Sequence, residues 1–163
     1  MSTNLRIDPK EVQRLRTETN AGVMDCKRAL EDAKGDFERA KVLLRQRGLA
    51  AVAKKSGREA KEGLIASYIH AGGRKGALVE IASETDFVAR SEEFQKLALE
   101  VSMQVAAMSP KDVDELYAQA YIRDASKTIK DLVTTLVASV GENVSVRRIQ
   151  RFAIGEADGE AES

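Results

Sequence analysis

The chain has 163 residues, enough for one domain or two small ones, and its 26 Lys and Arg side chains balance 26 Asp and Glu side chains. A formal net charge of zero at pH 7 creates no overall field toward nucleic acid or an anionic membrane, which disfavours a general polyanion binder. The single cysteine, Cys26, excludes an internal disulfide, and one cysteine with one histidine, His70, cannot build a zinc site within one chain. No metal and no cofactor is therefore expected.

Aromatic content and hydropathy narrow the function classes further. With three tyrosines, four phenylalanines and no tryptophan, an aromatic platform that stacks single-stranded nucleic acid is disfavoured. The sequence shows no signal peptide and no apolar run long enough for a transmembrane helix. The chain is therefore expected to be cytoplasmic, with no membrane partner.

The first third of the chain predicts three helices. Asp8 is a candidate N-cap before Pro9 at the first helical position, with Ile7 and Val12 placed to form a hydrophobic staple across the cap. After a break over residues 17–22, a second helix is indicated by apolar positions at helical spacing, and a third is expected to end at Gly48. The positions of the second helix are Cys26, Ala29, Leu30 and Ala33, and those of the third are Phe37, Ala40 and Leu44. Residues 1–48 are thus expected to form a compact three-helix unit.

Residues 49–62 are interpreted as a short helix or linker between two bodies. The segment is rich in alanine and basic residues, with Ser56-Gly57 near its middle. Its basic run consists of Lys54, Lys55, Arg58 and Lys61. Two interpretations remain open for this run: a solvated face, or contact with an acidic partner surface.

Beyond residue 62 the periodicity changes from helical to strand-like. Residues 64–71 and 77–83 flank the glycine-rich segment 72–76, which predicts a β-hairpin. A phosphate-binding loop is excluded there, because such a loop ends in Gly-Lys-Ser/Thr and opens a helix, whereas this turn joins two strands.

Three more helices and a strand are predicted after the hairpin. A long helix is expected to begin at the N-cap Ser91, cover the hairpin and end at Ser109-Pro110. A shorter helix over residues 113–120 and another over 129–140, ended by Gly141, should follow. The last ordered element is expected to be a strand over 144–154, and the acidic residues 155–163 are expected to form a disordered tail.

One large aromatic, Phe87, lies at the joint between the hairpin and the long helix. The preceding strand includes residues 78–81 and the next helix begins near Ser91, so Phe87 is on a short connection. Connections run over protein surfaces, where an aromatic beside a carboxylate suits an anchor for a partner protein. The alternative interpretation is that Phe87 folds back as the lid of a small core.

Three segments together resemble a known family. They are residues 20–27 (Asn-Ala-Gly-Val-Met-Asp-Cys-Lys), residues 84–90 (Glu-Thr-Asp-Phe-Val-Ala-Arg) and residues 141–148 (Gly-Glu-Asn-Val-Ser-Val-Arg-Arg). In order and spacing they resemble bacterial elongation factor Ts, the guanine-nucleotide exchange factor of elongation factor Tu, over roughly residues 9–154. The chain resembles the short form of that family, with a single core subdomain.

The resemblance implies an α+β fold. Its parts are an N-terminal three-helix module of the ubiquitin-associated type at residues 1–48, a linker at 49–62, and a core at 63–154. The core would hold an antiparallel hairpin, a third strand and packing helices, together with the surfaces for dimerisation and partner binding. Residues 155–163 would form the disordered acidic tail.

The same resemblance implies where the partner binds. In the family, an aspartate and a phenylalanine enter the nucleotide domain of elongation factor Tu beside its magnesium site, and the matching positions here are Asp86 and Phe87, flanked by Thr85 and Val88. The turn of the first module touches the same partner domain, and the matching positions are Leu15, Val23 and Met24. Family members often have methionine where this chain has Val23. Whether Asp86 contacts the partner or orders its own loop stays open.

The implied function is guanine-nucleotide exchange on elongation factor Tu during translation elongation, with no bond-making chemistry and hence no enzyme activity. A homodimer is expected through elements that follow the linker. Cys26 is interpreted as a core residue and His70 has no recognisable carboxylate partner for base catalysis. The alternative function is a ribosome- or RNA-associated adaptor that uses the basic run at 54–61 and the arginines near residue 150 as phosphate contacts: Arg147, Arg148 and Arg151.

Overall fold

The computed structural model describes residues 6–157, and these residues divide into two compact units. The first, here called the helical unit, contains the residues up to Ser56 together with Thr134–Gly141. The second, the sheet unit, contains Gly57–Val133 and the residues from Glu142 onward. The mixture of helices and antiparallel strands confirms the predicted α+β class. The predicted boundaries at 48 and 62 stay a prediction.

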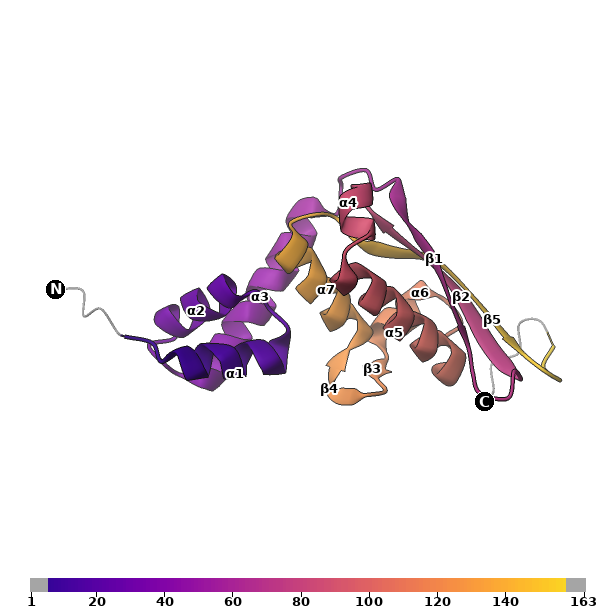
Figure 1. The fold of residues 1–163 in the computed structure, drawn as a ribbon, viewed down its shortest axis with the longest axis horizontal. Coiled ribbons are helices and arrows are strands. Elements are labelled where there is room, and N and C mark those ends of the chain that lie inside the picture. Colours follow the sequence, from indigo (N-terminus) through magenta and orange to yellow (C-terminus); the bar gives the residue numbers. More distant parts are fainter. Residues whose placement is uncertain (1–5, 158–163) are drawn as a thin grey trace. The chain divides into compact units, whose positions relative to one another are not determined.

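Three helices of the helical unit follow one another from the N-terminal side (Figure 1): α1 (Pro9–Thr19), α2 (Val23–Asp32) and α3 (Phe37–Lys55). The predicted start of the first helix is confirmed, because an Asp8 carboxylate oxygen accepts a hydrogen bond from the Lys10 backbone N–H at 2.9 Å. At its other end, Asn20 adopts the left-handed conformation and its N–H donates to the Arg16 carbonyl, which ends the helix.

The core of the helical unit is built from small side chains. Its buried members are Leu15, Cys26, Ala29, Leu30, Ala33 and Ala40, and Ile7, Val12 and Phe37 are among the partly buried side chains around it. Cys26 is completely buried, as predicted, and burial raises the pKa of its thiol. The thiol is therefore a packing group rather than a nucleophile.

Helix α3 does not end at Gly48 as the sequence suggested but continues to Lys55. Gly48 is buried, and a Cβ built on it would lie 2.7 Å from the Thr134 Cγ2 atom of helix α7 (Ile129–Val140). This glycine therefore permits a close approach of two helices within the helical unit. Gly48 is therefore a packing glycine within the helix and not a helix terminator.

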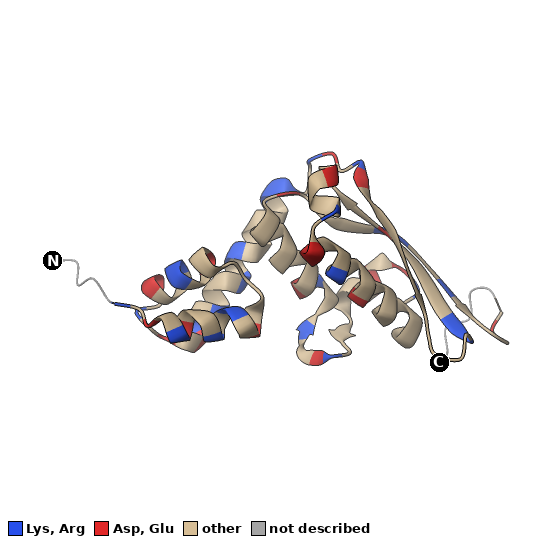
Figure 2. Ribbon diagram, viewed as in Figure 1, with Lys and Arg blue, Asp and Glu red and all other residues tan. Residues whose placement is uncertain are grey.

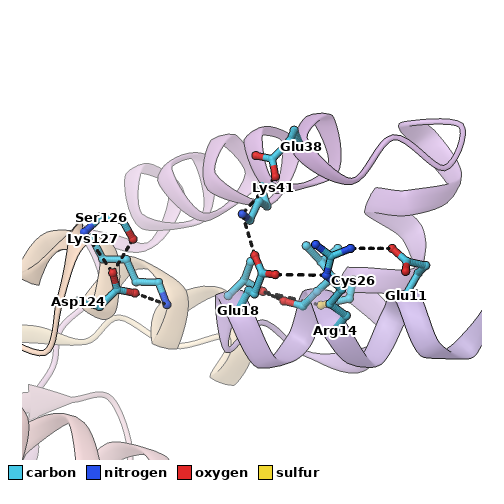
Figure 3. A network of polar contacts seen from close by, with 11 residues as sticks. Glu11, Arg14, Glu18, Cys26, Glu38, Lys41, Asp124, Ser126 and Lys127 are labelled. Carbon is cyan, nitrogen blue, oxygen red and sulfur yellow. Dashed lines mark hydrogen bonds and ion pairs between the residues drawn. The ribbon is translucent and has the colours of Figure 1, made fainter.

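Charged side chains join α1 to α3 at the surface of the helical unit (Figure 3). Glu18 pairs with Lys41 at 2.8 Å and with Arg14 at 3.4 Å, and Arg14 lies over the ring of Phe37. The hydrogen bond from Lys41 lowers the pKa of the Glu18 carboxyl and raises that of Lys41 itself. Such exposed pairs add little stability.

The sheet unit contains a three-stranded antiparallel sheet in the order β1-β2-β5 (Figure 1), with strands β1 (Glu62–Ile69), β2 (Lys75–Ser83) and β5 (Ser145–Ala153). The predicted hairpin and final strand are thereby confirmed. Helix α5 (Glu92–Met108) begins at the predicted N-cap Ser91, whose hydroxyl accepts from the Phe94 N–H at 3.3 Å. It packs across one face of the sheet, on the side that buries Val79 and Ile81.

The sequence missed a small second sheet. After α6 (Val113–Ala118), strands β3 (Ala120–Tyr121) and β4 (Asp124–Thr128) form a two-stranded hairpin that leads into α7. Its strands are short and mostly polar, so no alternation of apolar residues announced them. The hairpin is held by Gln104 of α5, whose side chain donates to the Ala120 carbonyl and accepts from the Ile122 N–H.

The remaining predictions concern membrane-spanning helices and the C-terminal tail. None of the helices within residues 6–157 is long and apolar enough to cross a bilayer. Most of the predicted tail, residues 158–163, lies outside the described residues. Within the described part, Glu156 pairs with Arg151 of β5.

Gly63 supports a testable statement about the sheet. Its φ is +141°, and a Cβ at this position would lie 2.1 Å from the Ile81 carbonyl oxygen of the neighbouring strand. Because backbone cannot move aside as a side chain can, we expect Gly63→Ala to lower the free energy of unfolding by about 3 kcal/mol or more. Urea unfolding measures the change. Gly57→Ala is the matched control: nothing lies within 4 Å of a Cβ there, so its effect should be within about 1 kcal/mol of zero.

Candidate functional site

The site is the short connection that follows β2, where α4 (Asp86–Ala89) forms a single turn between the sheet and α5 (Figure 1). Phe87 is 85% exposed, the largest exposed fraction among the large apolar side chains of residues 6–157. The prediction that this ring faces solvent is confirmed, and the alternative, a lid over a small core, is wrong. The ring is held out because its neighbours Val88 and Ala89 are buried.

Local hydrogen bonding explains why the chain turns here. Thr85 has extended backbone angles and caps α4, with its hydroxyl oxygen accepting from the Val88 N–H at 3.3 Å. With Val88 and Ala89 packed inward on one side of a four-residue helix, the side chains at the start of the helix are directed to the other side. Asp86 and Phe87 are therefore both exposed. The geometry presents one ring and one carboxylate next to each other.

Asp86 already has a partner within the chain. Its carboxylate forms an ion pair with Arg90 at 2.9 Å, and both side chains are more than half exposed. The pair spans one helical turn, the spacing at which opposite charges meet on a helix. The ion pair lies within the loop's own segment. Both roles left open for Asp86, contact with a partner and ordering of its own loop, stay predictions.

The residues expected to bind from the first module are placed differently from one another. Val23 and Met24 begin α2 and are exposed, next to Gly22, which caps that helix without a side-chain hydrogen bond. Leu15 is 0% exposed at the centre of the helical core. A direct partner contact by Leu15 would require the module to open, so its place in the structure is that of a support.

Glu142 and Asn143 lie in one of the three segments that resemble the family, but no local pattern predicts a role for either residue. The Glu142 carboxylate accepts hydrogen bonds from the backbone N–H groups of Glu84 and Thr85 at 3.1 and 3.0 Å, and from the Thr85 hydroxyl at 2.6 Å. The Asn143 N–H donates to the Glu84 carboxylate at 2.7 Å. These contacts join positions more than 55 residues apart in the chain. No local spacing rule relates such positions, and only the folded sheet brings them together.

Within residues 6–157, no group of three or more His, Cys, Asp or Glu side chains is placed to hold a metal ion. The single histidine, His70, lies near the hairpin turn, where its Nδ1 atom is 2.9 Å from the Tyr68 hydroxyl. A tyrosine hydroxyl orients an imidazole but does not supply the carboxylate that a general base normally has behind it.

An exposed aromatic on a short, well-anchored helix, beside a carboxylate, is typical of a protein-binding surface and not of a substrate cleft. Comparison with known proteins identifies the family. A sequence model described as elongation factor TS matches residues 84–160, which include this loop. The chain is 42% identical over 195 residues to elongation factor Ts of Anaeromyxobacter dehalogenans strain 2CP-1, with 92% of this chain and 89% of the relative covered.

Other relatives agree. Elongation factor Ts of Caldanaerobacter subterraneus subsp. tengcongensis is 41% identical, covering 92% of this chain and 98% of the relative. A chloroplastic elongation factor Ts of Guillardia theta is 40% identical, covering 93% and 90%. The chain belongs to the elongation factor Ts family and is an elongation factor of protein biosynthesis.

The alignments also show a difference in length. They extend over 195 residues in the two bacterial comparisons, whereas this chain has 163 residues. The relatives therefore contain residues that have no counterpart here.

The exposure of Phe87 generates a stability prediction. Truncating a side chain that folding leaves in water removes almost no buried area, so Phe87→Ala should change the free energy of unfolding by less than about 0.5 kcal/mol. Phe94→Ala is the contrast, because that ring is 0% exposed and its loss should cost about 3 to 5 kcal/mol. Urea unfolding of both variants measures the difference. Equal destabilisation by the two would mean that Phe87 packs against the protein after all.

Proposed function

We propose that this chain is a guanine-nucleotide exchange factor for elongation factor Tu, and that it promotes GDP release by inserting the loop of Asp86 and Phe87 beside the partner's magnesium site. The proposal rests on membership of the family together with one observation: the family's loop carries an aromatic ring that is 85% exposed on a fixed turn. We place this activity in the cytoplasm.

Exchange of this kind needs no bond chemistry from the factor. A protein that binds the nucleotide-free form of a GTPase more tightly than the GDP form must weaken GDP binding by the same factor, because the two equilibria are linked. The factor accelerates release by passing through an intermediate in which both ligands are held loosely. A catalytic residue in the usual sense is therefore not required.

The Phe87 ring supplies the favourable term for that intermediate. Burying it between two helices of the partner is worth about 2 kcal/mol. That free energy offsets displacement of the groups that hold the magnesium ion, and the ion in turn neutralises phosphate charge. Without its magnesium, GDP binds weakly. Thr85 and Val88 act from behind, Thr85 as the helix cap and Val88 as the buried anchor of α4.

The helical unit provides a second contact. Val23 and Met24 offer an exposed apolar pair at the start of α2, and the flexible thioether of methionine adapts to many surfaces. Leu15 stabilises this surface from inside the core. A second weak contact raises the affinity of the whole chain for the partner. It takes no part in the insertion of the Phe87 ring between the partner's helices, here called the wedge.

The outer face of the sheet fits the expected homodimer. The strand register places Ile65, Ile69, Leu78 and Phe152 on the face opposite α5, and all four are exposed. The charged pair on this face, Glu80 with Arg148, cancels its own charge. A neutral apolar face is complementary to an identical copy of itself, and two sheets commonly pack in this way.

The alternative function, an RNA-associated adaptor, loses support. Two of the arginines expected to contact phosphate are engaged: Arg148 pairs with Glu80, and Arg151 pairs with Glu156. In the basic run, Arg58 pairs with Glu84 and Lys61 with Glu59. Figure 2 shows acidic and basic residues interspersed along the ribbon rather than separated by sign. A nucleic-acid partner is therefore not proposed.

The wedge is tested by Phe87→Ala. Loss of a central aromatic anchor costs about 2 to 4 kcal/mol, so stimulated GDP release from elongation factor Tu should slow by at least about thirtyfold. The measurement is loss of a fluorescent GDP analogue from purified elongation factor Tu with substoichiometric factor. Phe87→Leu should retain part of the rate. Leu99→Ala should retain all of it, because Leu99 is an exposed apolar residue outside the loop, on α5. Normal exchange by Phe87→Ala would rule out insertion of the ring as the cause of GDP release.

The second contact is tested by the double substitution Val23→Ser and Met24→Ser. We expect the factor concentration for half-maximal stimulation to rise about tenfold while the maximal rate stays nearly constant, because an affinity contact is lost and the wedge is kept. Val42→Ser is the control, since Val42 is 54% exposed on α3 against 56% for Met24. A fall in the maximal rate with unchanged half-saturation would contradict this assignment.

The dimer is tested by placing charge on the sheet face. Leu78→Asp should convert a dimer into a monomer in sedimentation equilibrium, because two copies would bury unpaired carboxylates against each other. Leu99→Asp puts the same charge on the exposed side of α5 and should leave the mass unchanged. A monomeric wild-type chain at micromolar concentration, or a dimeric Leu78→Asp variant, would rule out this interface.

A further inference from the structure

Two segments far apart in the chain meet behind the Phe87 loop, and both belong to the sheet unit. One is the end of β2, at Glu84 and Thr85; the other is the turn before β5, at Glu142 and Asn143. The proposed wedge uses only the exposed side of the loop. Glu142 and Asn143, on the inner side of the loop, have no part in exchange assigned to them so far.

Both carboxylate oxygens of Glu142 accept hydrogen bonds from the loop. One oxygen accepts from the two successive backbone N–H groups of Glu84 and Thr85, and the other accepts from the Thr85 hydroxyl. Hydrogen bonds to an ionised carboxylate are shorter and stronger than neutral ones. Three of them on a two-residue segment fix the direction in which the chain leaves β2.

The Thr85 hydroxyl connects the Glu142 carboxylate to α4. The Thr85 hydroxyl donates to Glu142 and accepts from the Val88 N–H, so one side chain links the carboxylate to the first turn of α4. The donated bond orients the hydroxyl so that its free lone pair faces the Val88 N–H. Phe87 lies inside that turn, between the cap and Val88, so its orientation depends on Glu142 through Thr85.

A second set of contacts closes the arrangement in the opposite direction. The Asn143 N–H donates to the Glu84 carboxylate, while the Glu84 N–H donates to Glu142, so the two segments exchange hydrogen bonds reciprocally. The Asn143 side chain is buried and donates to the Arg58 carbonyl at 2.8 Å. The turn that carries Glu142 is thus itself fixed to the start of the sheet unit.

We propose that Glu142 is a positioning residue for nucleotide exchange: it holds the Phe87 loop in its inserting conformation before the partner arrives. This inference rests on the proposed function. Ordering a flexible loop during binding costs free energy that a loop already held does not lose. Glu142 contributes to the exchange rate through Thr85 and α4, and not by contact with elongation factor Tu or its nucleotide.

The first measurement needs no partner. In Glu142→Ala, amide hydrogen exchange at Glu84, Thr85 and Val88 should become at least about tenfold faster, because each loses its acceptor or the group that orients it. Amides at the centre of β2 should keep their protection. Unchanged amide hydrogen exchange at Glu84 and Thr85 would show that Glu142 does not hold the loop.

The second measurement uses elongation factor Tu. Glu142→Ala should lower the second-order rate constant of stimulated GDP release by about tenfold, and Glu142→Gln by less, since an amide oxygen still accepts from two N–H groups. Glu115→Ala is the matched control: that carboxylate accepts from the Lys111 N–H at 3.1 Å, away from the loop. Its loss should leave the rate constant unchanged.

A double variant separates positioning from a merely structural effect. If Glu142 acts through the ring, Glu142→Ala should slow exchange little further when Phe87 is already alanine, while its effect on unfolding stays the same in both backgrounds. Fully additive losses of rate would overturn the proposal. So would a normal rate in a Glu142→Ala variant whose loop amides have lost protection.

The exchange function of the chain and the positioning role of Glu142 are ruled out by different results. If the wild-type chain did not stimulate GDP release at all, the exchange function would be wrong even with the loop protected as described. If the wild type were active and the Glu142 variants were equally active, only the positioning role would be wrong. Should Glu142→Ala fail to fold, Glu142→Gln carries the same tests with smaller expected changes.

Discussion

A four-residue helix has too few hydrogen bonds of its own to persist in water, so α4 exists only because its surroundings hold it. Val88 and Ala89 are packed into the sheet unit, and Thr85 caps the first turn. With those three positions fixed, the ring of Phe87 has no place in its own core. The exposed aromatic is thus a direct result of the packing on either side of it, and the proposed insertion of Phe87 depends on that packing.

Local patterns predicted most of the fold. The caps at Asp8 and Ser91, the glycine-rich hairpin turn and the apolar spacing of the long helices were all read correctly, because each depends on residues close in sequence. The errors occurred where distant residues decide. Gly48 serves a neighbouring helix rather than ending its own, and the β3–β4 hairpin is held by Gln104 of α5 instead of by its own side chains.

The functional site likewise combines features that local sequence predicts with features that only the fold determines. Exposure of Phe87 followed from its position on a connection, whereas burial of Leu15 shows that resemblance to a family transfers a position without its surroundings. Glu142 is the strongest case. Its three hydrogen bonds reach residues 57 and 58 positions away, and no spacing in a single sequence relates a turn before the last strand to the end of the second.

The small side chains inside the helical unit have a consequence for its behaviour. Four of the six buried core members are alanine or cysteine, which leave little apolar surface to remove from water. With little apolar surface to bury, this module gains less hydrophobic stabilisation than the sheet, which packs against Phe94 and Val101. Warming should therefore loosen the helices before the strands, and the affinity for a partner would fall with temperature sooner than the ability to expel a nucleotide.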